Sequence, residues 1–163
     1  MNDDGDEYDA IGVIHSPFET PEGMPIQPVG ESTAEETVEL DAADEEGLQD
    51  LDGFSHCILL YHFHESDGDV SLRVEPFLDE TERGLFATRA PTRPNRIGLS
   101  VVEIRDVSGT ELTVGGIDVV DGTPLLDLKP FVPAFDVPDD AEAGWVDASE
   151  STARSTRADD RFQ

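Results

Sequence analysis

The sequence is poor in the residues from which disulfides, metal clusters and membrane spans are built. It contains one cysteine, Cys57, which permits no internal disulfide and no cysteine-based metal cluster. The longest uninterrupted apolar run, Cys57 to Tyr61, is far too short to cross a membrane. Residues 1–7 are acidic where a secretory signal would be basic. We therefore expect a soluble, cytoplasmic protein.

Bases are also scarce. The chain has 38 Asp and Glu against 10 Lys and Arg, with Lys129 its one lysine, and a formal net charge of −28. Such one-sided charge opposes a compact chain unless salt screens it. At about 1 M salt the Debye length is roughly 3 Å, and most of this repulsion disappears. The composition favours adaptation to a salt-rich cytoplasm, and the alternative is an ordinary acidic protein with a disordered acidic tail.

Short apolar runs, rich in β-branched residues and separated by glycine or proline, predict strands rather than helices. The expected strands are Ile11–His15, Thr37–Leu40, Ser55–His64, Ser71–Glu75, Leu85–Thr88, Ile97–Val107, Glu111–Val114, Ile117–Val120 and Leu125–Phe131. Only Asp41–Leu51 has a helical pattern. Val107–Thr110 predicts a hairpin turn, and a change of apolar phase at Val101 and Val102 predicts a β-bulge or a sharp bend.

This pattern predicts an all-β, single-domain protein, a small barrel or sandwich with little helix. Apolar residues make up 37% of the chain, enough for one modest core. We expect the folded unit at 10–136, a flexible acidic N-terminus at 1–9 and an acidic, disordered tail at 137–163. A doubly wound nucleotide fold is disfavoured because no Gly-x-Gly-x-x-Gly motif follows a strand.

One stretch of the chain has no acids at all. At the average of 38 acids in 163 residues, a window of twenty should hold four or five, yet residues 83–102 hold none. The same window carries Arg83, Arg89, Arg93 and Arg96, with two prolines that stiffen the intervening loop. Guanidinium groups suit phosphate and carboxylate. The window predicts an anion site, and the alternative is that these arginines pair with acids elsewhere.

Two other segments are weaker candidates. His56, His62 and His64 share one face of a predicted strand and could ligate a metal, but no carboxylate completes a set, so hydrogen-bonded imidazoles are the alternative. The segment Asp118–Asp127 contains Asp-Gly-Thr-Pro, which is a turn by composition and could also hold a polar ligand with its backbone and carboxylate.

Several blocks, in one order along the chain, resemble the TsaA-like or TrmO-type family. They cover about residues 10–136 and are Ile11–Phe18, Gln27–Pro28, Leu51–His56, Gly84–Asn95, Ile97–Ser100 and Asp121–Pro130. The resemblance implies a small β-barrel that binds S-adenosylmethionine without a Rossmann sheet. It also implies a homodimer that methylates N6 of threonylcarbamoyladenosine, the base 3′ of the tRNA anticodon. The acidity would make this chain a haloarchaeal member.

The resemblance also implies which residues form the site. Cofactor contacts would fall on Gln27, Pro28, His64, Arg89, Asp121, Gly122, Thr123 and Pro124. Contacts with the substrate RNA would fall on Arg93, Asn95 and Arg96. An adenine N6 bonded to a carbonyl is a poor nucleophile, so loss of its proton would help the transfer, and Asp121 and His64 are the candidate acceptors. No metal is expected.

Two departures from the family pattern affect the expected substrate contacts. Arg96 stands where the family has a second proline, which reduces the stiffness of the loop and adds positive charge. An acidic tail follows the barrel where some bacterial members carry a further domain. The alternative function is a non-catalytic barrel module that binds a small anion or nucleotide.

Overall fold

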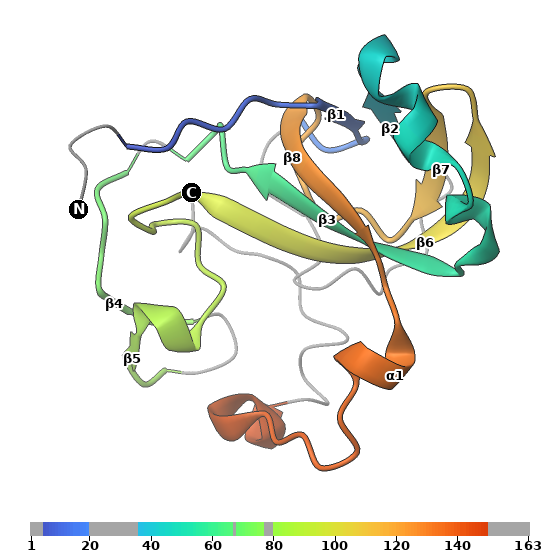
Figure 1. Cartoon of the computed structure of the whole chain (residues 1–163). Helices are drawn as coiled ribbons and strands as arrows, with labels where there is room; N and C mark the ends of the chain where they lie inside the picture. The colour runs from blue at the N-terminus through green and yellow to red at the C-terminus, as the bar shows by residue number, and fades with distance from the viewer. Residues whose placement is uncertain (1–4, 20–35, 67, 77–79, 150–163) are drawn as a thin grey trace.

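The computed structural model describes residues 5–19, 36–66, 68–76 and 80–149. Six antiparallel strands close into a barrel in the order β1-β2-β7-β6-β3-β8 (Figure 1). The strands are β1 (Gly12–His15), β2 (Glu36–Leu40), β3 (His56–His62), β6 (Ile97–Ser108), β7 (Glu111–Gly115) and β8 (Thr123–Pro130). The prediction of a small all-β barrel with little helix is confirmed.

The barrel encloses the core because inward and outward positions alternate along each strand. Ile14, Val38, Leu112 and Leu125 are fully buried, and each comes from a different strand. Burial of such side chains is worth about 1.5–3 kcal/mol each, which is the main force that closes the barrel. The hairpin between β6 and β7 is confirmed, with Gly109 in the left-handed region (φ +61°).

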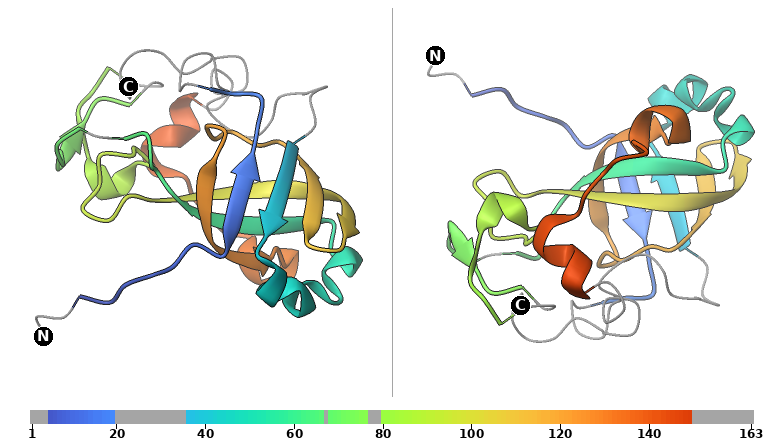
Figure 2. Two further views of the ribbon diagram at one scale, coloured as in Figure 1. Left: turned by 90° about the horizontal axis from the view of Figure 1, so that it is seen from above. Right: turned by 90° about the horizontal axis from the view of Figure 1, so that it is seen from below.

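Smaller elements lie outside the barrel. A two-stranded ribbon, β4 (Arg73–Val74) and β5 (Arg83–Gly84), leads into the 3-10 turn η3 (Leu85–Ala87), and all three lie to one side of the barrel (Figures 1 and 2). A short helix, α1 (Pro133–Asp136), and the 3-10 turn η4 (Gly144–Ser149) follow β8. The part of the chain that the structure describes has no helix both long and apolar enough to span a membrane.

One local prediction is confirmed and two were wrong. Residues 41–51 are helical as predicted, in the form of two 3-10 helices, η1 (Ala42–Leu48) and η2 (Leu51–Gly53), and Asp50 between them adopts a left-handed conformation (φ +70°). Residues 85–88 are the turn η3, and 117–120 are a buried loop. Residues 85–88 and 117–120 have the composition of strands. The barrel is closed, however, so it has no free edge strand with which either segment could pair.

The predicted β-bulge exists at another position. The register of β6 against β7 shifts between Ile104 and Asp106, so Arg105 is the extra residue, and no shift occurs at Val101 and Val102. The apolar pattern changes phase at Val101 and Val102 because β6 carries apolar side chains on both its inner and its outer face. Val102 points into the core, whereas Ile97 and Leu99 are 43% and 41% exposed on the outer face.

Candidate functional site

The acid-free window folds around η3 and the loop that follows it. Nη1 of Arg93 lies within hydrogen-bond distance of three backbone carbonyls, those of Leu85 (3.4 Å), Thr88 (2.8 Å) and Ala90 (3.2 Å). The guanidinium of Arg96 donates to the carbonyl of Gly68. Carbonyls hold these side chains without cancelling their charge. Among the described residues, no carboxylate forms an ion pair with Arg93 or Arg96, so the loop keeps its positive charge.

The first arginine of the window contacts the segment after β8. The guanidinium of Arg83 lies over the ring of Trp145, 5.6 Å from its centroid. Nε1 of Trp145 donates to the carbonyl of Ala87 at 2.8 Å, so η4 packs beside η3, as both views in Figure 2 show. The tail boundaries stay a prediction, but this contact places residue 145 against the arginine loop.

Arg89 is the arginine of the window that faces the barrel. Its side chain is exposed, and it lies near enough to Asp118 and Tyr61 for its charge to lower the pKa of both groups. Among the described residues it donates no hydrogen bond and forms no ion pair. Its planar group of donors is therefore available to an anion.

A chain of hydrogen bonds inside the barrel ends at Asp118. The Ser100 hydroxyl donates to Oδ1 of Asp118 (2.6 Å) and accepts from the hydroxyl of Tyr61 (2.8 Å). Burial raises the pKa of Tyr61, which keeps this phenol protonated as the donor. Burial also raises the pKa of Asp118 to about 6, against the opposing effects of the Ser100 hydrogen bond and the charge of Arg89. Strongly perturbed carboxyl groups of this kind concentrate at functional sites.

A second carboxylate lies beside Asp118. Glu36 is 1% exposed, and its Oε2 accepts the backbone N–H of Ile117 at 3.1 Å. Its charge adds to the rise in the pKa of Asp118. Glu36 therefore both fixes the loop before Asp118 and makes that carboxyl harder to ionise.

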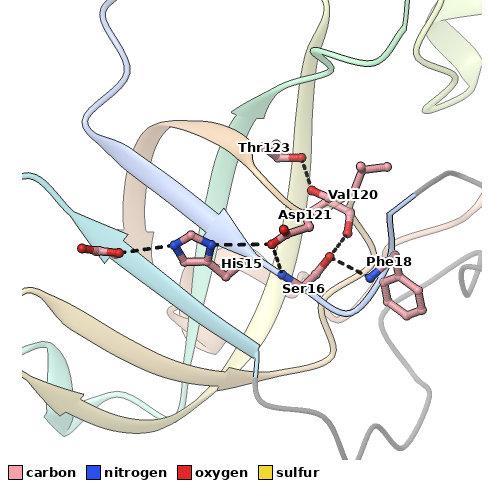
Figure 3. Close-up of polar contacts among 8 residues, drawn as sticks. His15, Ser16, Phe18, Val120, Asp121 and Thr123 are labelled. Atoms are coloured by element: carbon pink, nitrogen blue, oxygen red, sulfur yellow. Dashed lines mark hydrogen bonds and ion pairs between the residues drawn. The ribbon is translucent and has the colours of Figure 1, made fainter.

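The predicted Asp-Gly-Thr-Pro turn joins this loop to β8 (Figure 3). Gly122 has φ +83°, and the backbone N–H of Thr123 donates to the carbonyl of Val120 at 3.3 Å. The N–H of Gly122 donates to the carbonyl of Ile14 at 2.9 Å, which ties the turn to the end of β1. Only glycine adopts such a backbone conformation readily, so the prediction of a tight turn here is confirmed.

Within this turn the Asp121 carboxylate is held by two groups from the end of β1 (Figure 3). Its Oδ1 accepts the backbone N–H of Ser16 at 3.0 Å and lies 3.6 Å from Nδ1 of His15. Nε2 of His15 lies 3.3 Å from Oε2 of Glu39. The two imidazole nitrogens of His15 therefore lie near two carboxylates, one from β2 and one from the turn.

The remaining predicted site residues are less closely joined. Nε2 of His64 lies 3.5 Å from Oε1 of Glu65, and no hydrogen bond or ion pair within the described ranges joins His64 to Asp121. Asn95 is exposed in the loop before β6. Gln27 and Pro28 lie outside the described residues. In the parts of the chain with described placement, no three His, Cys, Asp or Glu side chains gather as metal ligands.

Sequence reasoning missed the group formed by Asp118, Ser100, Tyr61 and Glu36. Asp118 lies in the segment predicted as a turn, but the predicted site residue of that segment is Asp121. A usable signal was present in β6, where Ser100 occupies an inward position between apolar neighbours. An inward hydroxyl needs a partner, which predicts a polar group opposite it.

Comparison with known proteins agrees with this architecture. Residues 13–137 match the family model of the tRNA-methyltransferase O N-terminal domain. A probable S-adenosyl-L-methionine-binding protein of Pyrococcus abyssi is 46% identical over 155 residues, covering 95% of this chain and 84% of the relative. The tRNA (adenine(37)-N6)-methyltransferase of Escherichia coli is 34% identical over 152 residues, covering 88% of this chain.

The crystal structure of TrmO from Pseudomonas aeruginosa superposes with a TM-score of 0.75 at 39% identity and covers 89% of this chain. The chain spans 65% of the length of the E. coli relative and 64% of the P. aeruginosa chain. The family model nevertheless spans the barrel from β1 to α1. This protein belongs to the tRNA-methyltransferase O family.

Proposed function

We propose that this protein is an S-adenosylmethionine-dependent methyltransferase that acts on N6 of threonylcarbamoyladenosine at position 37 of tRNA. The observation that carries the proposal is the place of Arg89 in a barrel of this family: its guanidinium has no hydrogen-bond or ion-pair partner among the described residues, yet it lies near enough to Asp118 to lower the pKa of that carboxyl. The names of the relatives support both the cofactor and the substrate.

The side chains at this end of the barrel fit the cofactor. S-Adenosylmethionine carries a carboxylate, an ammonium group and a sulfonium cation, so it needs a cationic and an anionic partner. Arg89 would hold the carboxylate with its planar donors. Asp118, whose pKa is about 6, is mostly ionised at neutral pH and would face a positive group of the cofactor. The turn Asp121–Pro124 would complete the contact with backbone groups.

When bound, the cofactor supplies an activated methyl group, so the protein mainly has to position the nucleophile. Asp121 is suited to accept a proton because its Oδ1 is fixed by Ser16 and His15. Its Oδ2 accepts no hydrogen bond from the described residues. His64, two residues after the end of β3, is the alternative acceptor.

Arg93, Asn95 and Arg96 would face the RNA. Their loop carries positive charge in an acid-free window of a protein whose net charge is −28. In molar salt, long-range repulsion between an acidic protein and RNA is screened, and short-range guanidinium contacts decide binding. We infer from the same charge that the protein works in a salt-rich cytoplasm.

We infer a homodimer formed through the outer face of β3 and β6. Leu60 pairs with Leu99 and Ile58 with Val101 on this face, and Ile97 extends it. A contiguous apolar surface is unusual on a soluble chain with this charge and favours burial against a second copy. Light scattering in molar KCl tests it, and a monomer at micromolar concentration would contradict it.

The function is tested with labelled S-adenosylmethionine and tRNA that carries threonylcarbamoyladenosine, in molar KCl. Incorporation of label into that nucleoside, identified by mass spectrometry, is the expected result. Calorimetric titration with the cofactor is run in parallel. Cofactor binding without methyl transfer would favour the non-catalytic binding module, and no binding at millimolar cofactor would contradict both.

A further inference from the structure

The aromatic side chain of Phe86 has no role in the site described above, although it lies inside the arginine window. Phe86 is the middle residue of η3, whose first residue, Leu85, is buried at 1% exposure. The Phe86 side chain instead is 74% exposed. The turn therefore anchors itself with one apolar side chain and presents the next to solvent.

The Phe86 ring is paired with a fixed cation. The guanidinium of Arg93 lies 5.6 Å from the ring centroid. Nη1 of Arg93 is held by carbonyls of the same loop, so the cation has a fixed position beside the ring. A cation over one face of a phenyl ring stabilises the pair and limits the motion of both groups.

The chemistry around this pair fits RNA better than an apolar partner. Residues 83–102 contain no carboxylate, and Arg89 of the proposed cofactor site is three residues along the chain from Phe86. At the start of the same window, the guanidinium of Arg83 lies over the ring of Trp145. Flat aromatic rings beside guanidinium groups are the surface on which proteins stack unpaired bases.

We propose that Phe86, backed by Arg93, is a stacking platform for an unpaired nucleobase of the substrate RNA. The inference rests on the proposed function. An enzyme that modifies a base acts on an unpaired base or extrudes the base from a duplex, and an aromatic platform next to the site offsets any stacking that is lost. Phe86 is then a specificity-determining residue for single-stranded loops, and duplex RNA offers it no free base face.

The experiment compares Phe86→Leu and Phe86→Trp, with Phe135→Leu as the matched control. Phe135 is 80% exposed on α1 and outside the arginine window, so the control removes an equally exposed phenyl ring elsewhere. Binding of an anticodon stem-loop RNA is measured by fluorescence anisotropy, cofactor binding by calorimetry and methylation by label transfer. A loop containing 2-aminopurine reports stacking directly through fluorescence quenching.

We expect Phe86→Leu to weaken RNA binding about tenfold or more, in line with the 1–3 kcal/mol per base lost when a stacking ring is removed. It should also remove the quenching. Phe86→Trp should keep the RNA affinity and the 2-aminopurine quenching within about twofold of the parent protein. Cofactor affinity should be unchanged in every variant. Phe135→Leu should match the parent protein throughout.

Unchanged RNA affinity in Phe86→Leu, with an active parent protein, would overturn the platform and leave the proposed function standing. A parent protein that binds the cofactor but neither binds nor methylates RNA would overturn both. If Phe86→Leu instead converts a dimer to a monomer in light scattering, the ring belongs to an interface between copies and the platform is wrong.

Discussion

Tyr61 lies directly opposite Gly98 across the β3–β6 pair, and its ring fills the space that a side chain at Gly98 would need. A Cβ at residue 98 would come within 2.3 Å of Cε2 of Tyr61 and 2.7 Å of Cζ of Phe63. The two rings meet edge to face with centroids 5.5 Å apart. This packing carries the Tyr61 hydroxyl to Ser100 and so supports the hydrogen-bond chain that ends at Asp118.

The first prediction is that Gly98→Ala lowers the free energy of unfolding by about 1–3 kcal/mol, because the added methyl group forces the rings apart. Denaturant unfolding in molar KCl measures the change. Gly53→Ala is the control, because a Cβ there meets nothing within 4 Å. An equal effect of the two substitutions would show that the Tyr61 ring moves aside without loss.

The second prediction concerns the paired N–H donors of the Arg89 guanidinium. Arg89→Lys keeps the charge but cannot make paired hydrogen bonds to a carboxylate, so cofactor affinity should fall about tenfold or more. Calorimetric titration measures it. Arg105→Lys is the matched control, since Arg105 lies at the bulge of β6 and contacts Glu103. If both variants bind the cofactor as the parent does, Arg89 does not hold the carboxylate.

The third prediction follows from the raised pKa of Asp118. A carboxyl that holds its proton more tightly when folded stabilises the fold below its ordinary pKa of 3.8, and this contribution is lost as the pH rises through about 6. Relative to Asp118→Asn, the parent protein should therefore lose up to about 3 kcal/mol of stability between pH 4 and pH 7. A stability difference that does not vary with pH would place the pKa of Asp118 near its ordinary value.

The same carboxyl should make cofactor binding depend on pH. Binding by the parent protein should weaken as the pH falls below about 6, where Asp118 gains its proton. Asp118→Asn should bind more weakly at pH 7, and its affinity should lack this step. Titrations at pH 5 and pH 7 on both proteins measure the effect.

The fourth prediction separates positioning from proton transfer at Asp121. Asp121→Asn keeps an oxygen to accept the Ser16 N–H but removes the charge beside His15. General-base catalysis contributes about 10²–10⁴-fold, so kcat should fall within that range while the KM for cofactor changes little. Single-turnover methylation measures the step. A loss confined to KM would assign Asp121 to cofactor binding alone.

The fifth prediction is that stability rises steeply with salt. Repulsion within a chain of charge −28 is screened over roughly 10 Å at 0.1 M salt but over roughly 3 Å at 1 M. Thermal unfolding from 0.1 to 3 M KCl should show a rising melting temperature. Full stability in dilute buffer would contradict salt adaptation and favour the ordinary acidic protein with a disordered tail.

Much of the barrel could be predicted from local patterns, because strand and turn residues carry local information. The hairpin at Gly109 and the turn at Gly122 needed only residues that tolerate positive φ. Residues 85–88 and 117–120 were predicted as strands because their composition is apolar and partly β-branched. Whether such a segment pairs depends on an available neighbour, and a closed barrel has none to offer.

The candidate site, too, could be predicted only in part from the sequence. Arg89, Arg93 and Arg96 could be singled out because the absence of acids around them is visible along the chain. Which groups each of these guanidinium groups contacts could not be predicted. The fold directs Arg93 and Arg96 to backbone carbonyls and leaves Arg89 beside Asp118. Position in space decides which guanidinium stays available to a ligand.

The chain's composition and order alone determined the class of fold, the acidic character and the location of the cationic loop, because these depend on periodicity and on counts. The tertiary structure alone decided the partnership of Tyr61, Ser100 and Asp118, which belong to β3, β6 and the loop before β8. Barrel closure brings these segments together and removes water from around them. The raised pKa of Asp118 follows from that burial and cannot be read from any one segment.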